Sequence, residues 1–148
     1  MYERILVPVD GSPTSSRGLD EAVRVAALTH ASLRLIHVVD DLPLALSADA
    51  CSPNLGDLVA LLRAGGETIL RDARKQVEAA GIPVDTVLRD TFEGRVCDQV
   101  VDEATAWHAD LIVLGTHGRR GPGRVLLGSD AEQILRLAPV PVLLVRGR

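Results

Sequence analysis

Three spaced glycines and a serine mark the part of the sequence best suited to bind an anion. Gly115-Thr116-His117-Gly118 is followed by nine residues and then by Gly128-Ser129. An apolar run, 112–114, precedes this motif, and residues 130–137 after it have their apolar side chains at helical spacing. Glycine lets the main chain approach a ligand closely, and the amides at the start of a helix attract negative charge. The spacing therefore predicts a phosphate-binding loop between a strand and a helix.

The loop between these glycines is basic. His117, Arg119, Arg120 and Arg124 lie in it without any acidic residue, although the chain as a whole is acidic. Backbone amides, the partial positive charge at the start of the last helix and the Ser129 hydroxyl would all favour a bound anion. The local charge therefore suits a polyphosphate.

A second polar stretch, Asp10-Gly11-Ser12, follows the apolar run 5–9. An aspartate in this position either contacts a ligand or starts a turn with the glycine and serine after it. The glycine motif later in the chain favours the ligand contact, and both interpretations remain open at this point.

Sequence patterns of efficient catalysis are missing. The chain has no lysine in a G-x-x-x-x-G-K-[ST] setting, no G-x-S-x-G nucleophile turn, and no acid/histidine pair with the spacing of a general base. Binding is therefore favoured over turnover. The alternative is slow hydrolysis of a nucleotide, which would need a metal ion and a positioned water, with Asp10 or Asp130 as the candidate residues.

Apolar runs alternate with amphipathic segments along the chain, a pattern typical of parallel strands joined by crossover helices. A helix that Thr14 or Ser15 caps should follow the first strand. Gly81 should end the second helix, whose middle Gly65-Gly66 would weaken. The predicted strands are 5–9, 33–39, 84–88, 111–114 and 140–145, and the later predicted helices are 58–80, 96–107 and 130–137.

The first, fourth and fifth predicted strands are nearly continuous in Val, Ile and Leu, which indicates burial on both faces. The sequence therefore predicts an α/β fold, a three-layer open sandwich around a five-stranded parallel sheet in the order 3-2-1-4-5. Ligands bind such sheets beyond the carboxyl ends of the strands, where the strand order reverses. That crevice would lie between strands one and four, where Asp10 and the glycine motif converge.

Composition limits the remaining possibilities. The 148 residues form one expected domain, 1–148, and 47% apolar residues suffice for a sizeable core. A net charge of −4 argues against a nucleic-acid partner.

Cys51 and Cys97 lack metal-ligand spacing and are expected to be reduced thiols. With no signal-peptide pattern after Tyr2 and no apolar run of about 18–20 residues, we expect a cytoplasmic protein without membrane contact.

These motifs together resemble the universal stress protein family, in particular its ATP-binding branch with the G-x2-G-x9-G-S motif. The resemblance spans essentially the whole chain and implies the Rossmann-like architecture of adenine nucleotide α-hydrolase-like proteins. The matching segments are Val7-Pro8-Val9-Asp10-Gly11-Ser12, Leu35-Ile36-His37-Val38, residues 109–119, Gly128-Ser129 and Val140-Pro141-Val142-Leu143-Leu144-Val145.

The resemblance implies a small regulatory module of the stress response whose conformation or partner binding depends on ATP, bound with Mg²⁺ (or Mn²⁺). It places the ribose at Asp10, the adenosine beside Pro8 and Val9, and the adenine edge at the backbone of Val38. The implied phosphate cradle comprises Gly115, Thr116, His117, Gly118, Arg119, Gly128 and Ser129, and Leu114 is a further residue expected at the nucleotide.

The sequence departs from this branch at Asp130, where a small or aliphatic residue is common. A carboxylate in the first helical turn stabilises the helix, but it would repel nearby phosphates unless a divalent cation lies between them. Three alternatives stay open: helix stabilisation alone, a metal-assisted role, or reduced nucleotide affinity.

Three further expectations concern the surroundings of the site. His37, within an apolar run, and Trp107, on the apolar side of its helix, should pack in the core. The segment 40–56 is either a flap over the nucleotide or a long surface loop. The last strand, Val140 to Val145, should lie at the sheet edge, and the resemblance implies a twofold homodimer formed through it.

Overall fold

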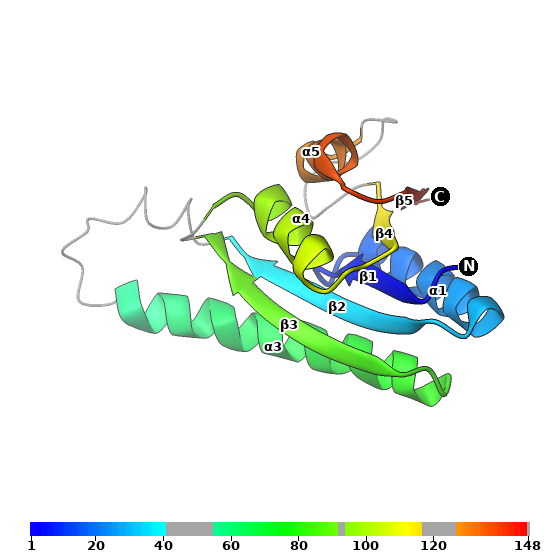
Figure 1. Ribbon diagram of the computed structural model, residues 1–148. Helices are drawn as coiled ribbons and strands as arrows, with labels where there is room; N and C mark the ends of the chain where they lie inside the picture. Colours follow the sequence, from blue (N-terminus) through cyan, green and yellow to red (C-terminus); the bar gives the residue numbers. More distant parts are fainter. Residues whose placement is uncertain (41–54, 92–93, 117–126, 148) are drawn as a thin grey trace.

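A computed structural model describes residues 1–40, 55–91, 94–116 and 127–147, with Leu55 described for its main chain only. Its five strands are all parallel and form one sheet in the order β3-β2-β1-β4-β5, which confirms the predicted fold class and strand order (Figure 1). The strands are β1 (Arg4–Pro8), β2 (Ser32–Val39), β3 (Val84–Asp90), β4 (Leu111–Gly115) and β5 (Val142–Val145).

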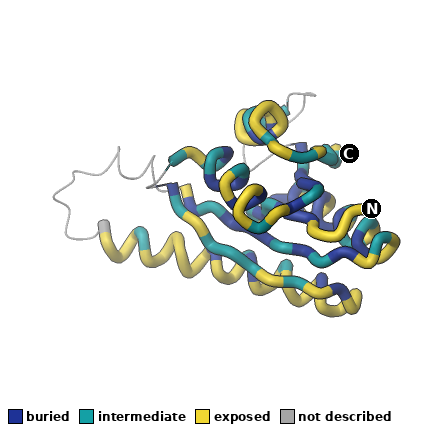
Figure 2. The backbone as a smooth tube through the Cα atoms, viewed as in Figure 1, coloured by how far each residue is buried: buried dark blue, intermediate teal, exposed yellow. Residues whose placement is uncertain are grey.

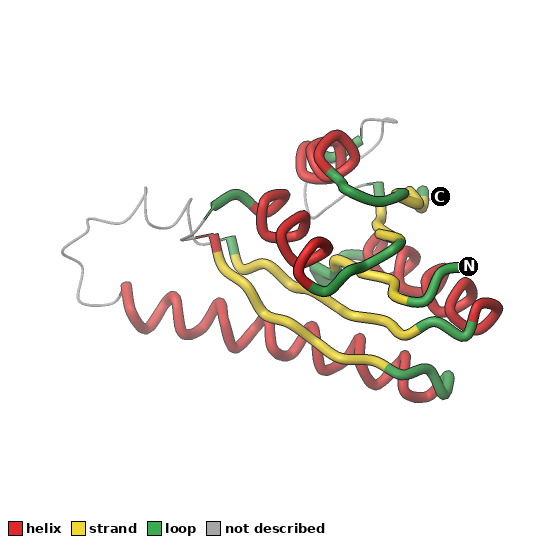
Figure 3. The backbone as a smooth tube through the Cα atoms, viewed as in Figure 1, coloured by secondary structure: helices red, strands yellow, loops and turns green. Residues whose placement is uncertain are grey.

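Helices cover both faces of this sheet, as the crossover pattern predicts (Figure 3). Side chains of α1 (Pro13–Thr29) and α3 (Leu55–Ala79) pack in one core cluster with Ile5 and Val7. Side chains of α4 (Val96–Ala106) and α5 (Ser129–Leu137) pack in a second cluster with Leu6. Successive β1 residues therefore point into different cores. Dark blue buried residues alternate with teal half-buried ones along β2 in Figure 2, whereas most residues of β1 and β4 are buried.

The last strand differs from its prediction. It begins at Val142 instead of Val140, and each of its residues is only half-buried, so the expected burial on both faces is wrong for β5. Its position explains the exposure, because β5 is an edge strand that pairs with β4 alone in this sheet. The strand is apolar because its side chains pack against both core clusters, one on each face of the sheet.

Helix α1 begins earlier than expected. Ser12 caps it, not Thr14 or Ser15, and the Ser12 side chain accepts a hydrogen bond of 3.1 Å from the Ser15 amide. Pro13 then occupies the first helical position, where its missing N–H costs nothing. The consequence is that the cap lies next to Asp10, in the turn that leaves β1.

Helix α3 also starts earlier than predicted and runs through Gly65-Gly66 without a break. The two glycines differ in surroundings. A Cβ atom on Gly66 would lie 2.7 Å from His37 Cδ2 and 2.9 Å from Leu88 Cδ1, whereas one on Gly65 would meet nothing within 4 Å. Gly66 thus lets α3 pack tightly against the carboxyl end of β2.

A buried carboxylate that the sequence analysis missed ties α4 to the sheet. Glu103 is 3% exposed and pairs with Arg34 at 2.8 Å and with Arg89 at 2.6 Å. Arg34 also pairs with Asp85 and lies 4.7 Å from the ring centroid of Trp107. Trp107 is half-buried against the second core cluster, which is consistent with its predicted packing. This network fixes α4 across β2 and β3.

Among the described residues, no helix combines the length and the apolar composition that crossing a lipid bilayer would require.

Candidate nucleotide site

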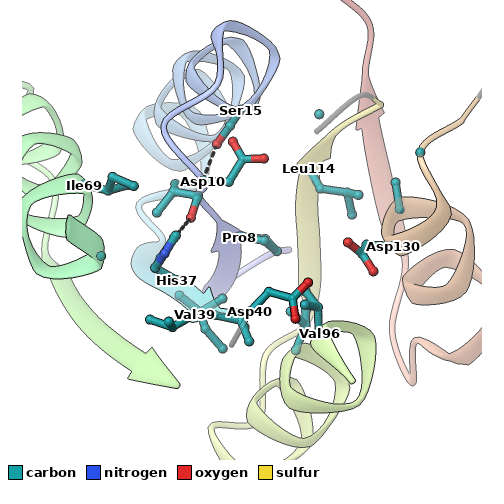
Figure 4. A pocket seen from close by; sticks show the side chains of 18 of the residues that line it. Pro8, Asp10, Ser15, His37, Val39, Asp40, Ile69, Val96, Leu114 and Asp130 are labelled. Carbon is teal, nitrogen blue, oxygen red and sulfur yellow. Dashed lines mark hydrogen bonds between the residues drawn. The ribbon is translucent and has the colours of Figure 1, made fainter. Parts of the chain in front are cut away.

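A cavity of about 1070 Å³ opens at the carboxyl ends of β1, β2 and β4, which is the predicted place in the sheet (Figure 4). The strand order reverses here, between β1 and β4. The volume lies slightly above the usual range for small-molecule sites, about 300–1,000 Å³. Nine predicted site residues line the cavity: Pro8, Val9, Asp10, Val38, Leu114, Gly115, Gly128, Ser129 and Asp130.

The turn after β1 forms one side of the cavity, which we call the β1 lip (residues 8–12). Asp10 Oδ1 accepts a 2.8 Å hydrogen bond from the Ser12 amide, and Gly11 has a positive φ of 77°. The turn-forming role considered for Asp10 is therefore observed. The same residue lines the cavity, so its carboxylate lies where a ligand would meet it.

His37 closes the floor beside this lip. It is buried, as predicted, and its Nδ1 lies 2.7 Å from the carbonyl oxygen of Val9. It also lines the cavity, which the sequence analysis did not foresee. A signal was available, because a polar ring within the run Leu35-Ile36-His37-Val38 lies directly at the end of a strand that feeds the predicted crevice.

Gly115, Gly128, Ser129 and Asp130 form the opposite side, which we call the β4 lip. Gly115 is also required for packing, a role that the sequence motif did not predict. A Cβ atom there would lie 2.6 Å from the carbonyl oxygen of Thr14, in the first turn of α1. Close packing of α1 on the end of β4 therefore requires this glycine, whether or not a ligand is bound.

Thr116 lies beneath the β4 lip and not in the cavity lining. Its side chain is buried, its amide donates to the Val145 carbonyl at 2.9 Å, and its carbonyl accepts from the Gly128 amide at 2.8 Å. The Thr116–Gly128 bond brings together the two halves of the glycine motif. His117, Gly118 and Arg119 fall outside the described residues, as do Arg120 and Arg124.

Helix α5 starts at the β4 lip with Gly128 as its cap residue and no side-chain cap. Its first amides thus lie at the cavity edge, where the helix dipole favours an anion. Asp130, in the first turn, also lines the cavity. Partial burial, and then the nearby carboxylates of Asp40 and Asp10, raise the pKa of Asp130.

The residues that sequence analysis missed come mostly from helices. Three carboxylates, Asp10, Asp40 and Asp130, line the cavity, but no group of three His, Cys, Asp or Glu side chains within the described ranges is arranged to hold a metal ion. Cys97, buried at the start of α4, is a free thiol, while Cys51 is outside the described residues. The additional lining residues include Ser15, His37, Asp40, Leu62, Gly66, Ile69, Val96 and Val100.

The fold defines a doubly wound α/β protein with a cavity at the switch point of its sheet. The chain belongs to the universal stress protein family, whose family model matches residues 1–146. A relative, universal stress protein A homolog 1 from Coxiella burnetii, is 35% identical over 146 residues, covering 97% of this chain and 96% of the relative.

Solved structures agree with this assignment. The universal stress protein UspA from Lactobacillus plantarum is similar at a TM-score of 0.85 and 31% identity, with 98% of each chain covered. A universal stress protein solved in complex with cAMP is similar at a TM-score of 0.69 and 26% identity, covering 98% of this chain and 97% of that one.

Proposed function

We propose that this universal stress protein binds ATP and acts as a small regulatory module of the cytoplasm, whose conformation or partner affinity depends on nucleotide occupancy. One observation carries the proposal: a single cavity is lined by the Asp10 turn on one side and by the first residues of α5 on the other. The first offers a carboxylate to a sugar hydroxyl, and the second offers amides to a phosphate.

The lining suggests how the nucleotide lies. Pro8, Val9 and Val38 supply apolar surface and main-chain atoms for the adenosine, and Asp10 lies beside the ribose. The phosphates extend toward Gly128-Ser129, with His117, Gly118 and Arg119 completing the basic loop. A family member solved with cAMP, an adenine nucleotide, supports this class of ligand for the site.

A divalent cation would complement the carboxylates at this end of the cavity. The charges of Asp130, Asp40 and Asp10 would repel a triphosphate, and Mg²⁺ (or Mn²⁺) bound with the nucleotide would offset that repulsion. Oxygen ligands from Asp130 and from the phosphates suit either ion.

Thermal unfolding with and without nucleotide tests the proposal. Ligand at about 100 times its dissociation constant stabilises the native state by about 2.7 kcal/mol, so ATP with Mg²⁺ should raise the melting temperature clearly. At equal nucleotide concentrations, ATP should stabilise more than AMP, because AMP lacks the outer phosphates. Equal stabilisation by the two nucleotides would remove the phosphate site from the proposal, and no stabilisation by either would refute the proposal.

Slow ATP hydrolysis is the second candidate, because Asp10 and Asp130 face the same cavity from opposite lips. Either carboxylate could hold a metal ion or orient a water molecule. Incubating the protein with Mg²⁺-ATP and measuring ADP by chromatography separates the two candidates. Turnover that Asp130→Asn abolishes would favour the enzyme, whereas bound ATP that is recovered intact would favour the regulatory module.

We also propose a homodimer formed through the C-terminal strand, predicted as Val140 to Val145. In β5, which lies at the sheet edge, alternate residues have their main-chain groups directed away from β4 and open to another strand. Leu135 and Leu137 of α5 add exposed apolar surface nearby in the sequence. Sedimentation should give a dimer for the native chain, and Leu144→Pro, which removes an outward N–H, should give a monomer.

A further inference from the structure

The peptide group that joins Val9 to Asp10 is held at both of its polar ends. Its carbonyl oxygen lies 2.7 Å from Nδ1 of His37, on β2. Its amide donates a 3.1 Å hydrogen bond to the hydroxyl of Ser15, in the first turn of α1. Figure 4 draws both bonds as dashed lines, on either side of the Asp10 backbone. Two side chains from different elements thus fix the plane of one peptide.

This peptide plane sets the direction of the Asp10 side chain, because rotating the plane turns the Cα–Cβ bond of the residue that follows it. The Asp10 carboxylate receives a third constraint from the Ser12 amide at 2.8 Å. Asp10 is consequently oriented in the cavity before any ligand arrives. A preorganised acceptor loses less conformational freedom when it binds a hydroxyl.

His37 is itself immobilised. Its ring is buried, and the close approach of Gly66 leaves no room for a Cβ atom, which would lie 2.7 Å from the ring. A carbonyl oxygen can only accept, so Nδ1 of His37 must carry the hydrogen. The Val9 amide bonds to the Ile36 carbonyl at 2.8 Å, so the His37 side chain adds one more bond to the ladder just past the end of β1.

We propose that His37 is a positioning residue for sugar recognition: by holding the Val9 carbonyl, it orients Asp10 toward the ribose hydroxyls and so determines the preference for ribonucleotides. Ser15 assists it from the other end of the same peptide. The inference rests on the proposed nucleotide function and adds the residue that sets its sugar specificity. His37 acts through Asp10 and needs no contact with the nucleotide.

Two substitutions separate the hydrogen bond from the packing. His37→Asn keeps an N–H donor at the position of Nδ1 and removes the ring, whereas His37→Phe keeps a ring and removes the donor. Calorimetry measures the dissociation constants of ATP and of 2′,3′-dideoxy-ATP for each variant. The ratio of the two constants reports sugar recognition alone, because loss of structure weakens both nucleotides together.

We expect the native protein to bind ATP at least about tenfold more tightly than the dideoxy nucleotide, as for a hydrogen bond to a charged group. His37→Asn should keep most of this ratio, and His37→Phe should lower it to about twofold or less. Asp10→Asn should lower it similarly, and adding His37→Phe to Asp10→Asn should lower it no further. Val77→Ala, a buried change outside the cavity, should reduce stability and leave the ratio unchanged.

The outcomes distinguish the two proposals. Failure of the native protein to bind ATP would refute the nucleotide function and this inference with it. Tight ATP binding with a ratio near one, or a ratio that His37→Phe preserves, would overturn the positioning role while the nucleotide function stands.

Discussion

The two lips of the cavity are built differently. The β1 lip is held by side-chain bonds to neighbouring elements: His37 to the Val9 carbonyl, Ser15 to the Asp10 amide, and Ser12 to the start of α1. The β4 lip depends on main-chain packing, with Gly115 against Thr14 and Gly128 bonded to Thr116. Polar side chains therefore orient Asp10, the residue proposed to bind the sugar. At the β4 lip, which is proposed to bind the phosphates, glycines allow the main chain to approach its neighbours closely.

This difference changes how the glycine motif is interpreted physically. Gly115 and Gly128 belong to one sequence motif, and a Cβ atom on Gly115 would overlap the main chain of α1. Gly128 begins a helix at the cavity edge. A motif that predicts phosphate binding can thus contain a glycine that the fold requires for its own packing.

The largest expected effect comes from Gly115→Ala. The added methyl would lie 2.6 Å from a main-chain oxygen of α1, which cannot move without shifting the helix. Overpacking costs about 1–3 kcal/mol and occasionally more, and we expect the upper part of that range here. Urea unfolding measures it. Gly56→Ala, at a helical site with nothing within 4 Å, is the control and should not destabilise.

Gly66→Ala tests the floor beside the β1 lip. Its methyl would lie 2.7 Å from the His37 ring, at an overpacking cost of about 1–3 kcal/mol, while the better helix propensity of alanine offsets about 1 kcal/mol. We therefore expect a net loss of stability of up to about 2 kcal/mol. Gly65→Ala, one residue earlier and open to space, should stabilise by about 0.5–1 kcal/mol. Equal stability of the two variants would show that α3 does not press on His37.

Ser12→Ala removes the cap of α1 and with it one support of the β1 lip. Loss of an N-cap side chain costs about 1 kcal/mol, and the Ser15 amide would be left in a buried turn without its acceptor. Ser16→Ala, which deletes an exposed hydroxyl four residues along the same helix, should change stability by less than about 0.5 kcal/mol. Thermal unfolding of both variants makes the comparison.

Strand order and the position of the cavity were predictable because buried parallel strands are apolar throughout and a switch point follows from topology alone. The same rule predicted that Asp10 and the later glycine motif would line one cavity. The parts that were not predictable depend on three-dimensional packing. Nothing local in the sequence distinguishes Gly66 from Gly65, and only the approach of α3 to β2 does so.

His37 illustrates the same limit for polar residues. Its burial could be predicted from its apolar neighbours, but its bond joins positions 28 residues apart and depends on the register of β1 against β2. The half-burial of β5 could not be read from its composition either, because an edge strand that contacts two cores is as apolar as a central one.

The smallest expected effect concerns the charge of the β4 lip. Since the pKa of Asp130 is raised, acidification neutralises this carboxyl at a higher pH than an ordinary aspartate, and removes a charge that faces the phosphates. ATP affinity measured without divalent cations should therefore increase as the pH falls through that pKa. Asp130→Asn should bind ATP about two- to fivefold more tightly than the native chain at pH 7, in line with about 0.4–1 kcal/mol for a solvent-accessible charge pair.

The advantage of Asp130→Asn should vanish at low pH, where the native carboxyl is also neutral, and comparing the two proteins at each pH cancels the titration of the nucleotide itself. Adenosine provides the reference, because a ligand without phosphates should not distinguish them. Saturating Mg²⁺ separates the alternatives left open for Asp130. A metal-assisted role requires the native chain to bind Mg²⁺-ATP more tightly than the variant, repulsion requires the reverse, and equal affinity leaves helix stabilisation as its role.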